Sequence, residues 1–239
     1  MNKLSVQLYS VRDAFAADPS GTLSRLAGLG FRQVEPYGVV ENLPSLRSGL
    51  PAFGLSAPTA HANLIGADQP AVFAAAAGCG IGTVIHPMVE AAQWQDDDAV
   101  IATATALNEA ARTGAGHGVT VGYHNHWWEL ESGRYDLFVS HLDPAVVLEV
   151  DTYWATAGGE DAPALLRRLG DRVRAIHVKD GDLATDGSGQ VPAGRGRVPI
   201  REVLAAAPDA LRVIEFDRYD GDIFAGLAAS YAYLTEVER

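Results

Sequence analysis

The sequence has a single cysteine, Cys79, and no apolar run of about 18 residues, the length that would predict a membrane span. One cysteine excludes an internal disulfide, and no membrane partner is expected. The N-terminal segment MNKLSVQLYS has neither the apolar core nor the cleavage site of a secretory signal. These absences favour a cytoplasmic location.

Positive charge is also scarce, since 18 Lys and Arg stand against 30 Asp and Glu and the formal net charge is −12. A nucleic-acid partner is therefore disfavoured, because phosphates attract a field of Lys and Arg. Neutral sugars are compatible with this charge. The 239 residues, 48% hydrophobic and 20% charged, predict one globular domain over 1–239 without a break in composition.

What the chain does contain is a series of short runs rich in Val, Ile and Leu, separated by stretches of helical character. This alternation predicts a parallel sheet with right-handed crossovers. Eight units without a glycine-rich loop after the first strand favour a (β/α)8 TIM barrel over an open doubly wound sheet. The expected strands are Leu4–Tyr9, Gln33–Tyr37, Gly54–Ala60, Thr83–His86, Val119–His124, Val146–Asp151, Val173–Val178 and Leu211–Phe216.

Two of the connections differ from the rest. The crossover from Val39 to Phe53 contains Pro44 and Pro51, so a helix is only weakly indicated there. The connection Gly181–Val198 is long and rich in Gly, Asp and Ser. It is either a flexible surface loop or a lid over the catalytic face.

Polar side chains stand at the ends of the last four expected strands, where a barrel places its catalytic groups. These are His124, Asp151, His177 and Glu215, which we expect to converge. Capping of a βα loop explains one such residue well, but it explains four on consecutive strands poorly. Two imidazoles and two carboxylates without a thiolate suit one divalent metal, either Mn, Co, Zn, Fe or Mg, rather than a structural zinc.

Four residues are candidates for proton transfer. Glu215 is a candidate base as well as a ligand, and its partner is Glu35 or His126. His126 shares the strand parity of His124 and is also an alternative to it as ligand. Lys179 is expected to stabilise charge, unless it pairs with its neighbour Asp180, and a surface salt bridge is the alternative for Glu35.

Further candidates for substrate contact lie at other strand ends and beside the expected ligands. For each of them a structural role, such as core packing or a hydrogen bond within the fold, is the alternative. They are Gln7, Tyr9, His61, His86, Trp128 and Trp154.

A metal at this position polarises a carbonyl and stabilises the enediolate formed when a neighbouring proton is removed. The favoured function is therefore isomerisation or epimerisation of a sugar, keto-sugar or cyclitol. Loss of a β-hydroxyl or glycosidic oxygen would instead make the protein a dehydratase or lyase. A non-catalytic sugar-binding barrel is the alternative from another class, and a homo-oligomer is left open.

Five segments, taken together and in order, resemble the xylose isomerase-like (AP endonuclease 2) superfamily of TIM barrels, specifically its sugar phosphate isomerase/epimerase group. The resemblance implies a divalent metal on His124, Asp151, His177 and Glu215. It also implies metal-dependent isomerase, epimerase or dehydratase chemistry. The segments are SVQLYSVRD from residue 5, GYHNHWWEL from 122, EVDTYWATAGGED from 149, RVRAIHVKDG from 172 and VIEFD from 213.

The chain departs from this superfamily at two places. Many of the isomerases have a glutamate where this chain has His124, and YHNH is similar to the YHHH of inosose dehydratase-like members, which favours dehydration or elimination on an inosose or 3-keto-glycoside. Arg195 replaces the glutamate of a Gly-Glu-Gly turn, and it either recognises an anionic group or reflects drift. Thr152, Tyr153 and Trp154 stand where the endonucleases have a further His, which argues against that activity.

Overall fold

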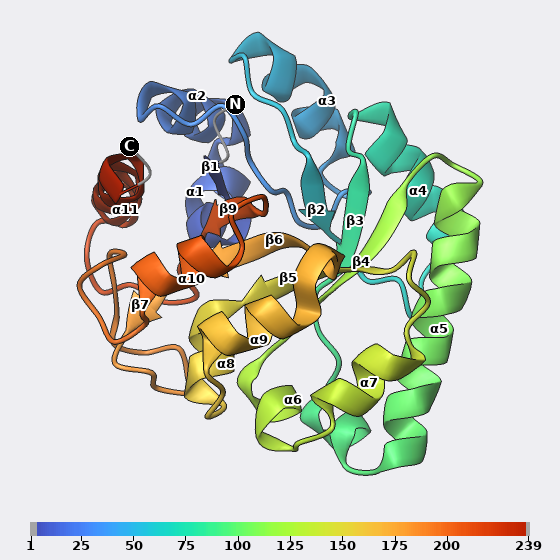
Figure 1. The fold of residues 1–239 in the computed structure, drawn as a ribbon. Helices are drawn as coiled ribbons and strands as arrows, with labels where there is room; N and C mark the ends of the chain where they lie inside the picture. Colours follow the sequence, from blue (N-terminus) through green and yellow to red (C-terminus); the bar gives the residue numbers. More distant parts are fainter. Residues whose placement is uncertain (1–3, 238–239) are drawn as a thin grey trace.

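The computed structural model describes residues 4–237, in which a curled parallel sheet is surrounded by helices (Figure 1). Seven strands form this sheet: β1 Leu4–Val6, β2 Thr59–His61, β3 Thr83–His86, β4 Thr120–His124, β5 Val147–Asp151, β6 Val173–Val178 and β9 Leu211–Ile214. Their order is β1-β9-β6-β5-β4-β3-β2, and every pairing is parallel. The parallel α/β architecture predicted from the alternation is confirmed.

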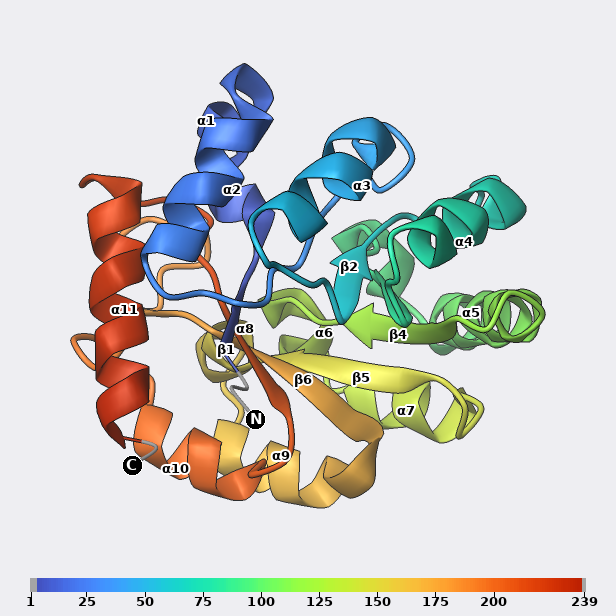
Figure 2. The same cartoon turned by 90° about the horizontal axis from the view of Figure 1, so that it is seen from above.

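Helices follow the strands and cover the outside of the sheet, as the view from above shows (Figure 2). They are α1 Arg12–Ala17, α2 Pro19–Gly28, α3 Leu43–Ala52, α4 Gln69–Gly78, α5 Asp97–Ala115, α6 Trp127–Glu131, α7 Tyr135–His141, α8 Thr152–Ala157, α9 Ala162–Leu169, α10 Ile200–Ala206 and α11 Ile223–Val237. Short 3₁₀ helices occupy Leu8–Val11, Ala91–Trp94 and Gly170–Arg172.

The sequence of α9 shows why these helices form where they do. Asp161 is its N-cap, and the carboxylate accepts a hydrogen bond from the backbone N of Ala164. Pro163 stands in the first turn, where a proline costs no helical hydrogen bond. Leu165 and Leu169 are buried against the sheet side, whereas the arginines between them are exposed.

The second expected strand, Gln33–Tyr37, makes isolated bridges instead of a ladder. Glu35 bridges Gln7 just after β1, and Tyr37 bridges His61 on β2. The proline within QVEPY has no N–H to donate, so this short run cannot form a continuous ladder with β2. The segment therefore lies between the two edge strands of the seven-stranded sheet and contacts both.

Three other expectations change. The strand expected at Gly54–Ala60 begins only at Thr59, directly after Pro58. A regular helix, α3, forms in the second crossover because Pro44 lies in its first turn and Pro51 near its end. The long connection after β6 contains a two-stranded antiparallel pair, β7 Asp180–Gly181 and β8 Gln190–Val191.

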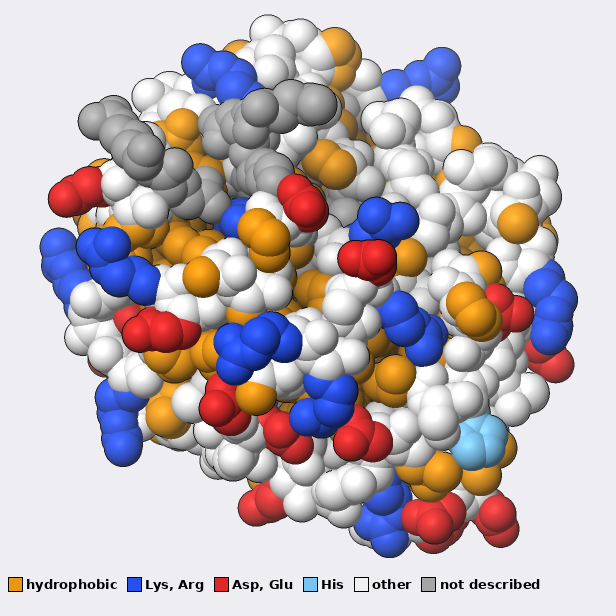
Figure 3. Space-filling model, viewed as in Figure 1, with side chains coloured by type: hydrophobic (Ala, Val, Ile, Leu, Met, Phe, Trp, Pro, Cys, Tyr) orange, Lys and Arg blue, Asp and Glu red, His pale blue; other side chains and the backbone are white. Residues whose placement is uncertain are grey.

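The surface of the described part bears charges of both signs. On the face of Figure 3, Lys and Arg side chains are interspersed with Asp and Glu instead of forming one basic patch. Within residues 4–237, every helix falls short of the combined length and apolarity that crossing a membrane requires.

Candidate active site

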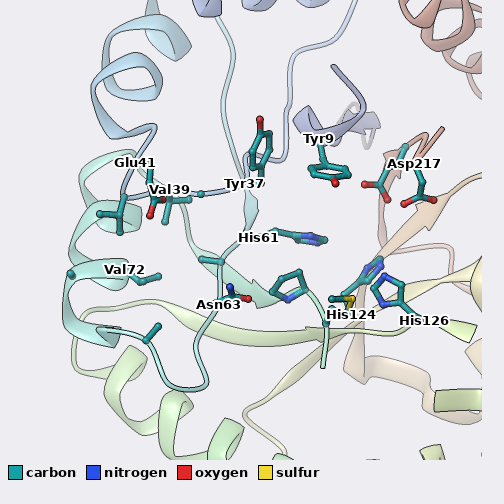
Figure 4. Close-up of a pocket in the computed structure, with 18 of the residues that line it drawn as sticks. Tyr9, Tyr37, Val39, Glu41, His61, Asn63, Val72, His124, His126 and Asp217 are labelled. Carbon is teal, nitrogen blue, oxygen red and sulfur yellow. The ribbon is translucent and has the colours of Figure 1, made fainter. Parts of the chain in front are cut away.

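A cavity of about 890 Å³ opens where the strands end (Figure 4). Its walls come from the carboxyl ends of β2, β3, β4, β6 and β9, from residues 37–41 and from the start of α4. This is the edge of a parallel barrel sheet at which active sites are found. The predicted site residues among those lining it are Tyr9, His61, His124, His126, Lys179 and Glu215.

The four predicted metal ligands lie on neighbouring strand ends, and three of them form one compact donor group. Asp151 on β5 and His177 on β6 are register partners, and Glu215 directly follows β9 on the other side of β6. His177 Nδ1 is 2.7 Å from Glu215 Oε2 and 4.0 Å from Asp151 Oδ2. His124 Nε2 is 3.7 Å from the same oxygen of Asp151. Donor atoms of Asp151, His177 and Glu215 all lie within 4.8 Å of one another, whereas His124 belongs to a second such group with His61, Glu149 and His177.

Asp151 is held so that one carboxylate oxygen faces this group. Its Oδ1 accepts a hydrogen bond of 2.8 Å from the backbone N of Trp154, as the N-cap of α8. Its Oδ2 pairs with the ammonium of Lys179, whose Nζ lies 2.9 Å away. A buried carboxylate oxygen is costly unless a cation faces it, and the Lys179 ammonium does so here. The fit to a divalent metal rests instead on the mixed nitrogen and oxygen donors of Asp151, His177 and Glu215.

Glu149, which the sequence analysis did not single out, contacts both imidazoles of this group. It lies two residues before Asp151 on β5 and therefore on the same face of the sheet. Its Oε2 is 3.1 Å from His124 Nδ1 and 3.0 Å from His177 Nε2. If these two nitrogens carry the protons, as we assign from the contacts, His124 Nε2 and His177 Nδ1 are left as acceptors. The acidic residue inside the apolar run VVLEVD was the available signal.

Glu35 lies behind His177 and does not line the cavity. It accepts a hydrogen bond of 2.8 Å from Gln7 Nε2 and a short one from Thr59, and its Oε1 is 2.7 Å from His177 Nε2. Burial, with the charge of Glu149, raises the pKa of Glu35. Gln7 and Glu35 thus support the imidazole of His177 from below instead of facing a substrate.

The two histidines that end β2 and β3 have different surroundings. His61 lines the cavity, and its Nε2 is 2.6 Å from Glu149 Oε2. His86 is buried outside the cavity wall, where its Nδ1 accepts a hydrogen bond of 3.1 Å from the backbone N of Leu64. Burial lowers the pKa of His86 to about 4. His61 therefore belongs to the site, whereas His86 fixes the connection after β2.

Lys179 places an ammonium group among three carboxylates. Its Nζ is 2.6 Å from Glu215 Oε2, 2.8 Å from Asp217 Oδ2 and 2.9 Å from Asp151 Oδ2. Burial disfavours the charged form, but the carboxylates outweigh it and raise the pKa of Lys179 well above its usual range. Asp217, two residues after Glu215, also lines the cavity and is a second residue that the sequence analysis missed.

His126 is sandwiched by two tryptophans. Its ring centroid is 4.6 Å from that of Trp128 and 6.0 Å from that of Trp154, with nearly parallel planes. His126 lines the cavity, whereas the two tryptophans stand behind it. His124, and not His126, lies beside Asp151.

Arg195 does not reach the cavity wall and is exposed in its turn. Asp180 holds this turn, because its carboxylate accepts hydrogen bonds from the backbone N of Gly194, Gly196 and Val198 at 2.9, 2.9 and 3.0 Å. A Cβ at Gly196 would lie 2.2 Å from Asp180 Oδ1, so the turn requires glycine there. Residues 181–198 contribute nothing to the cavity wall.

The curled parallel sheet with helices outside it is a fold shared with known TIM-barrel proteins. The chain belongs to the xylose isomerase-like TIM barrel family, whose model matches residues 45–213. The family predicted from the sequence motifs is thereby confirmed. No curated protein sequence matches the chain.

Solved structures with a similar fold cover nearly the whole chain. A sugar phosphate isomerase/epimerase from Parabacteroides distasonis is 20% identical, with 97% of this chain and 92% of that chain covered and a TM-score of 0.81. A probable 3-DHS dehydratase from Bacillus anthracis is 15% identical, with coverage of 97% and 98% and a TM-score of 0.78. An IOLI protein with a bound zinc atom is 13% identical, with coverage of 98% and 97% and a TM-score of 0.76. At these identities the similarity establishes the fold.

Proposed function

We propose that this protein is a divalent-metal-dependent isomerase or epimerase of a sugar, keto-sugar or cyclitol. The observation that carries the proposal is the buried donor group of Asp151, His177 and Glu215 beside the cavity, with His124 Nε2 3.7 Å from Asp151 Oδ2. When bound there, the metal supplies a Lewis acid that polarises a carbonyl and stabilises the charge formed by proton abstraction beside it.

The chain's own residues then bind the substrate and move the proton. Lys179 lines the cavity, and the positive charge of its ammonium stabilises the oxygen that becomes negative. Glu215 or His126, both on the cavity wall, takes the proton from carbon. Glu35, behind His177, positions that imidazole instead of acting on the substrate. Return of the proton to carbon gives the isomer or epimer.

Glu149 has a positioning role in this proposal. One carboxylate oxygen accepts from the inner nitrogens of both imidazoles and so turns their outer nitrogens toward Asp151 and Glu215. Carboxylates that accept from the second nitrogen of a metal-bound histidine fix its tautomer and ring orientation. Because both imidazoles contact the same oxygen of Glu149, the orientation of His124 depends on that of His177.

A dehydratase or lyase acting on an inosose or 3-keto-glycoside is the second candidate, and His124 favours it. Both nitrogens of this imidazole are engaged, one by Glu149 and the other toward Asp151, so it offers no proton acceptor to the substrate. Elimination needs one base and a donor that protonates the departing oxygen. Glu215, on the cavity wall, can serve as both by passing the proton it takes from carbon to the departing oxygen.

Solvent-hydrogen exchange tests the proposal. Protein incubated with Mn²⁺ or Co²⁺ is mixed in D₂O with a panel of ketoses and inososes, and exchange beside the carbonyl is followed by ¹H NMR. We expect exchange in the native protein and none in a folded Asp151→Ala variant. A new sugar isomer supports the first candidate, and an unsaturated ketone that absorbs in the ultraviolet supports the second. Binding without exchange would favour a sugar-binding barrel instead.

A further inference from the structure

The cavity has a second side that the chemistry above does not use. Figure 4 shows Val39 and Val72 at the opposite end from His124 and His126, with His61 between the two groups. This side is formed by residues 37–41, the start of α4 and the segment after β3. Its apolar lining residues are Tyr37, Val39, Val40, Ala62, Ala67, Ala71, Val72, Pro87 and Met88.

Exposure of large apolar side chains is concentrated at this same cavity. Within residues 4–237, the large apolar side chains that are strongly exposed are Tyr9 at 43%, Val40 at 41% and Met88 at 38%. All three line the cavity. Scattered apolar side chains on a surface need no explanation, but their confinement to the rim of one cavity points to an apolar ligand group.

The charges of the lining argue against an anionic substrate. Among the described lining residues, Lys179 is the only Lys or Arg, and its ammonium already contacts three carboxylates. The apolar side contributes two acidic residues, Glu41 and Asp68, and no cation. A phosphate group would therefore enter a field of like charge without a counterion of its own.

We propose that the substrate is a neutral keto-sugar that carries an apolar substituent, such as the keto form of an aryl or alkyl glycoside, for which the glycosides themselves are non-reacting analogues. The inference rests on the proposed function, because the sugar is taken to lie at the metal ligands. The apolar substituent then extends past His61 and packs against Val39, Val72 and Met88. The cavity of about 890 Å³ lies near the top of the roughly 300–1,000 Å³ found for small-molecule sites, far more than one sugar ring fills.

The test compares ligands that differ only in the substituent. Calorimetry on the Mn²⁺-incubated full chain measures Kd for the methyl and the phenyl β-glycosides of glucose, galactose and mannose. For at least one of the three sugars we expect the phenyl glycoside to bind about tenfold more tightly than the methyl glycoside, because the ring is buried. The 6-phosphates of the three hexoses should bind more weakly than the free sugars.

Two variants localise the effect. Met88→Gln should reduce the ratio of phenyl to methyl affinity to less than about threefold, because a polar side chain then faces the ring. Leu137→Gln, on α7 and outside the cavity, makes a comparable change in a half-buried side chain and should leave the ratio intact.

Equal affinity for phenyl and methyl glycosides of all three sugars, or preference for a hexose 6-phosphate, would overturn the inference. A second copy of the chain that covers the rim would also overturn it. Sedimentation would then show a dimer, and Met88→Gln would abolish this dimer without changing the ratio of phenyl to methyl affinity. The proposed function fails separately. It fails if the native chain binds no metal and Asp151→Ala leaves solvent-hydrogen exchange unchanged, whatever the ratio of phenyl to methyl affinity.

Discussion

The two sides of the cavity differ in burial, charge and chain origin. The metal side is built from strand ends, and its charged groups are almost wholly buried, with Asp151 and His177 at 0% exposure. The apolar side is built from loops and a helix start, and it exposes Val40 and Met88. Reacting groups must be held in fixed positions, whereas an apolar surface accepts a range of substituents.

The way each side is held follows from this difference. On the metal side the charged groups contact one another, and Glu149 by itself contacts His61, His124 and His177. Behind the apolar side, His86 accepts a hydrogen bond from the backbone N of Leu64. Substitutions on the first side should therefore change chemistry and metal affinity, and those on the second should change specificity and stability.

The largest effect is expected for Glu215→Gln on the metal side. Glutamine has the same size but is neither an anionic ligand nor a base, so solvent-hydrogen exchange should fall by about 100-fold or more. Glu41→Gln makes the same substitution on the apolar side and should retain the metal. Exchange rates and metal content of the two variants are compared. Full activity in Glu215→Gln would contradict the role of Glu215 in catalysis and, with it, the chemical role of the metal side.

A smaller effect is expected from the titration of His86 on the apolar side. Its pKa is about 4 in the folded chain against 6.5 for the unperturbed group, so the unfolded state binds more protons between these values. The unfolding free energy should therefore decrease as the pH falls from 6.5 to 4, with a contribution from His86 of about 3 kcal/mol.

Urea denaturation at several pH values measures this contribution. His86→Asn can still accept the hydrogen bond from Leu64 N but does not titrate, so its stability should depend less on pH in that interval. The native protein then loses stability relative to the variant as the pH falls. Parallel curves for the two proteins would show that His86 is not kept neutral by burial.

The effect expected for Glu149→Gln is a 10–100-fold weaker Kd for Mn²⁺, the usual cost of losing a group that orients metal ligands. The amide donates to one imidazole where the carboxylate accepted, so ¹⁵N NMR of labelled histidine should show a changed tautomer. Glu149→Asp should restore part of the affinity.

Glu129→Gln is the matched control for Glu149→Gln. Glu129 is equally buried, and burial raises its pKa to about 8, so the glutamine replaces a neutral carboxyl group. Metal affinity should be unchanged in this variant. If Glu149→Gln lowered the number of bound ions from two to one without changing the affinity of the other, Glu149 would itself be a ligand of a second ion.

The sequence was most informative where a strand ended in a single polar residue. Strands 83–86 and 173–178 have the predicted bounds, and Asp151, His177 and Glu215 form one buried donor group. Glu149 was not predicted because it lies two positions before the strand end, on the same face of the sheet as Asp151. The apolar side could not be predicted, because short connections around Val39 and Met88 have no periodicity that would place them at one cavity.

Elemental analysis of protein purified without chelator or metal-affinity tag, performed on the native chain and on Asp151→Ala, tests the central claim most directly. The account predicts about one divalent transition metal per native chain and its loss in the variant, with an unchanged circular dichroism spectrum. Absence of metal after incubation with Mn²⁺ or Co²⁺, or equal metal in both proteins, would contradict it.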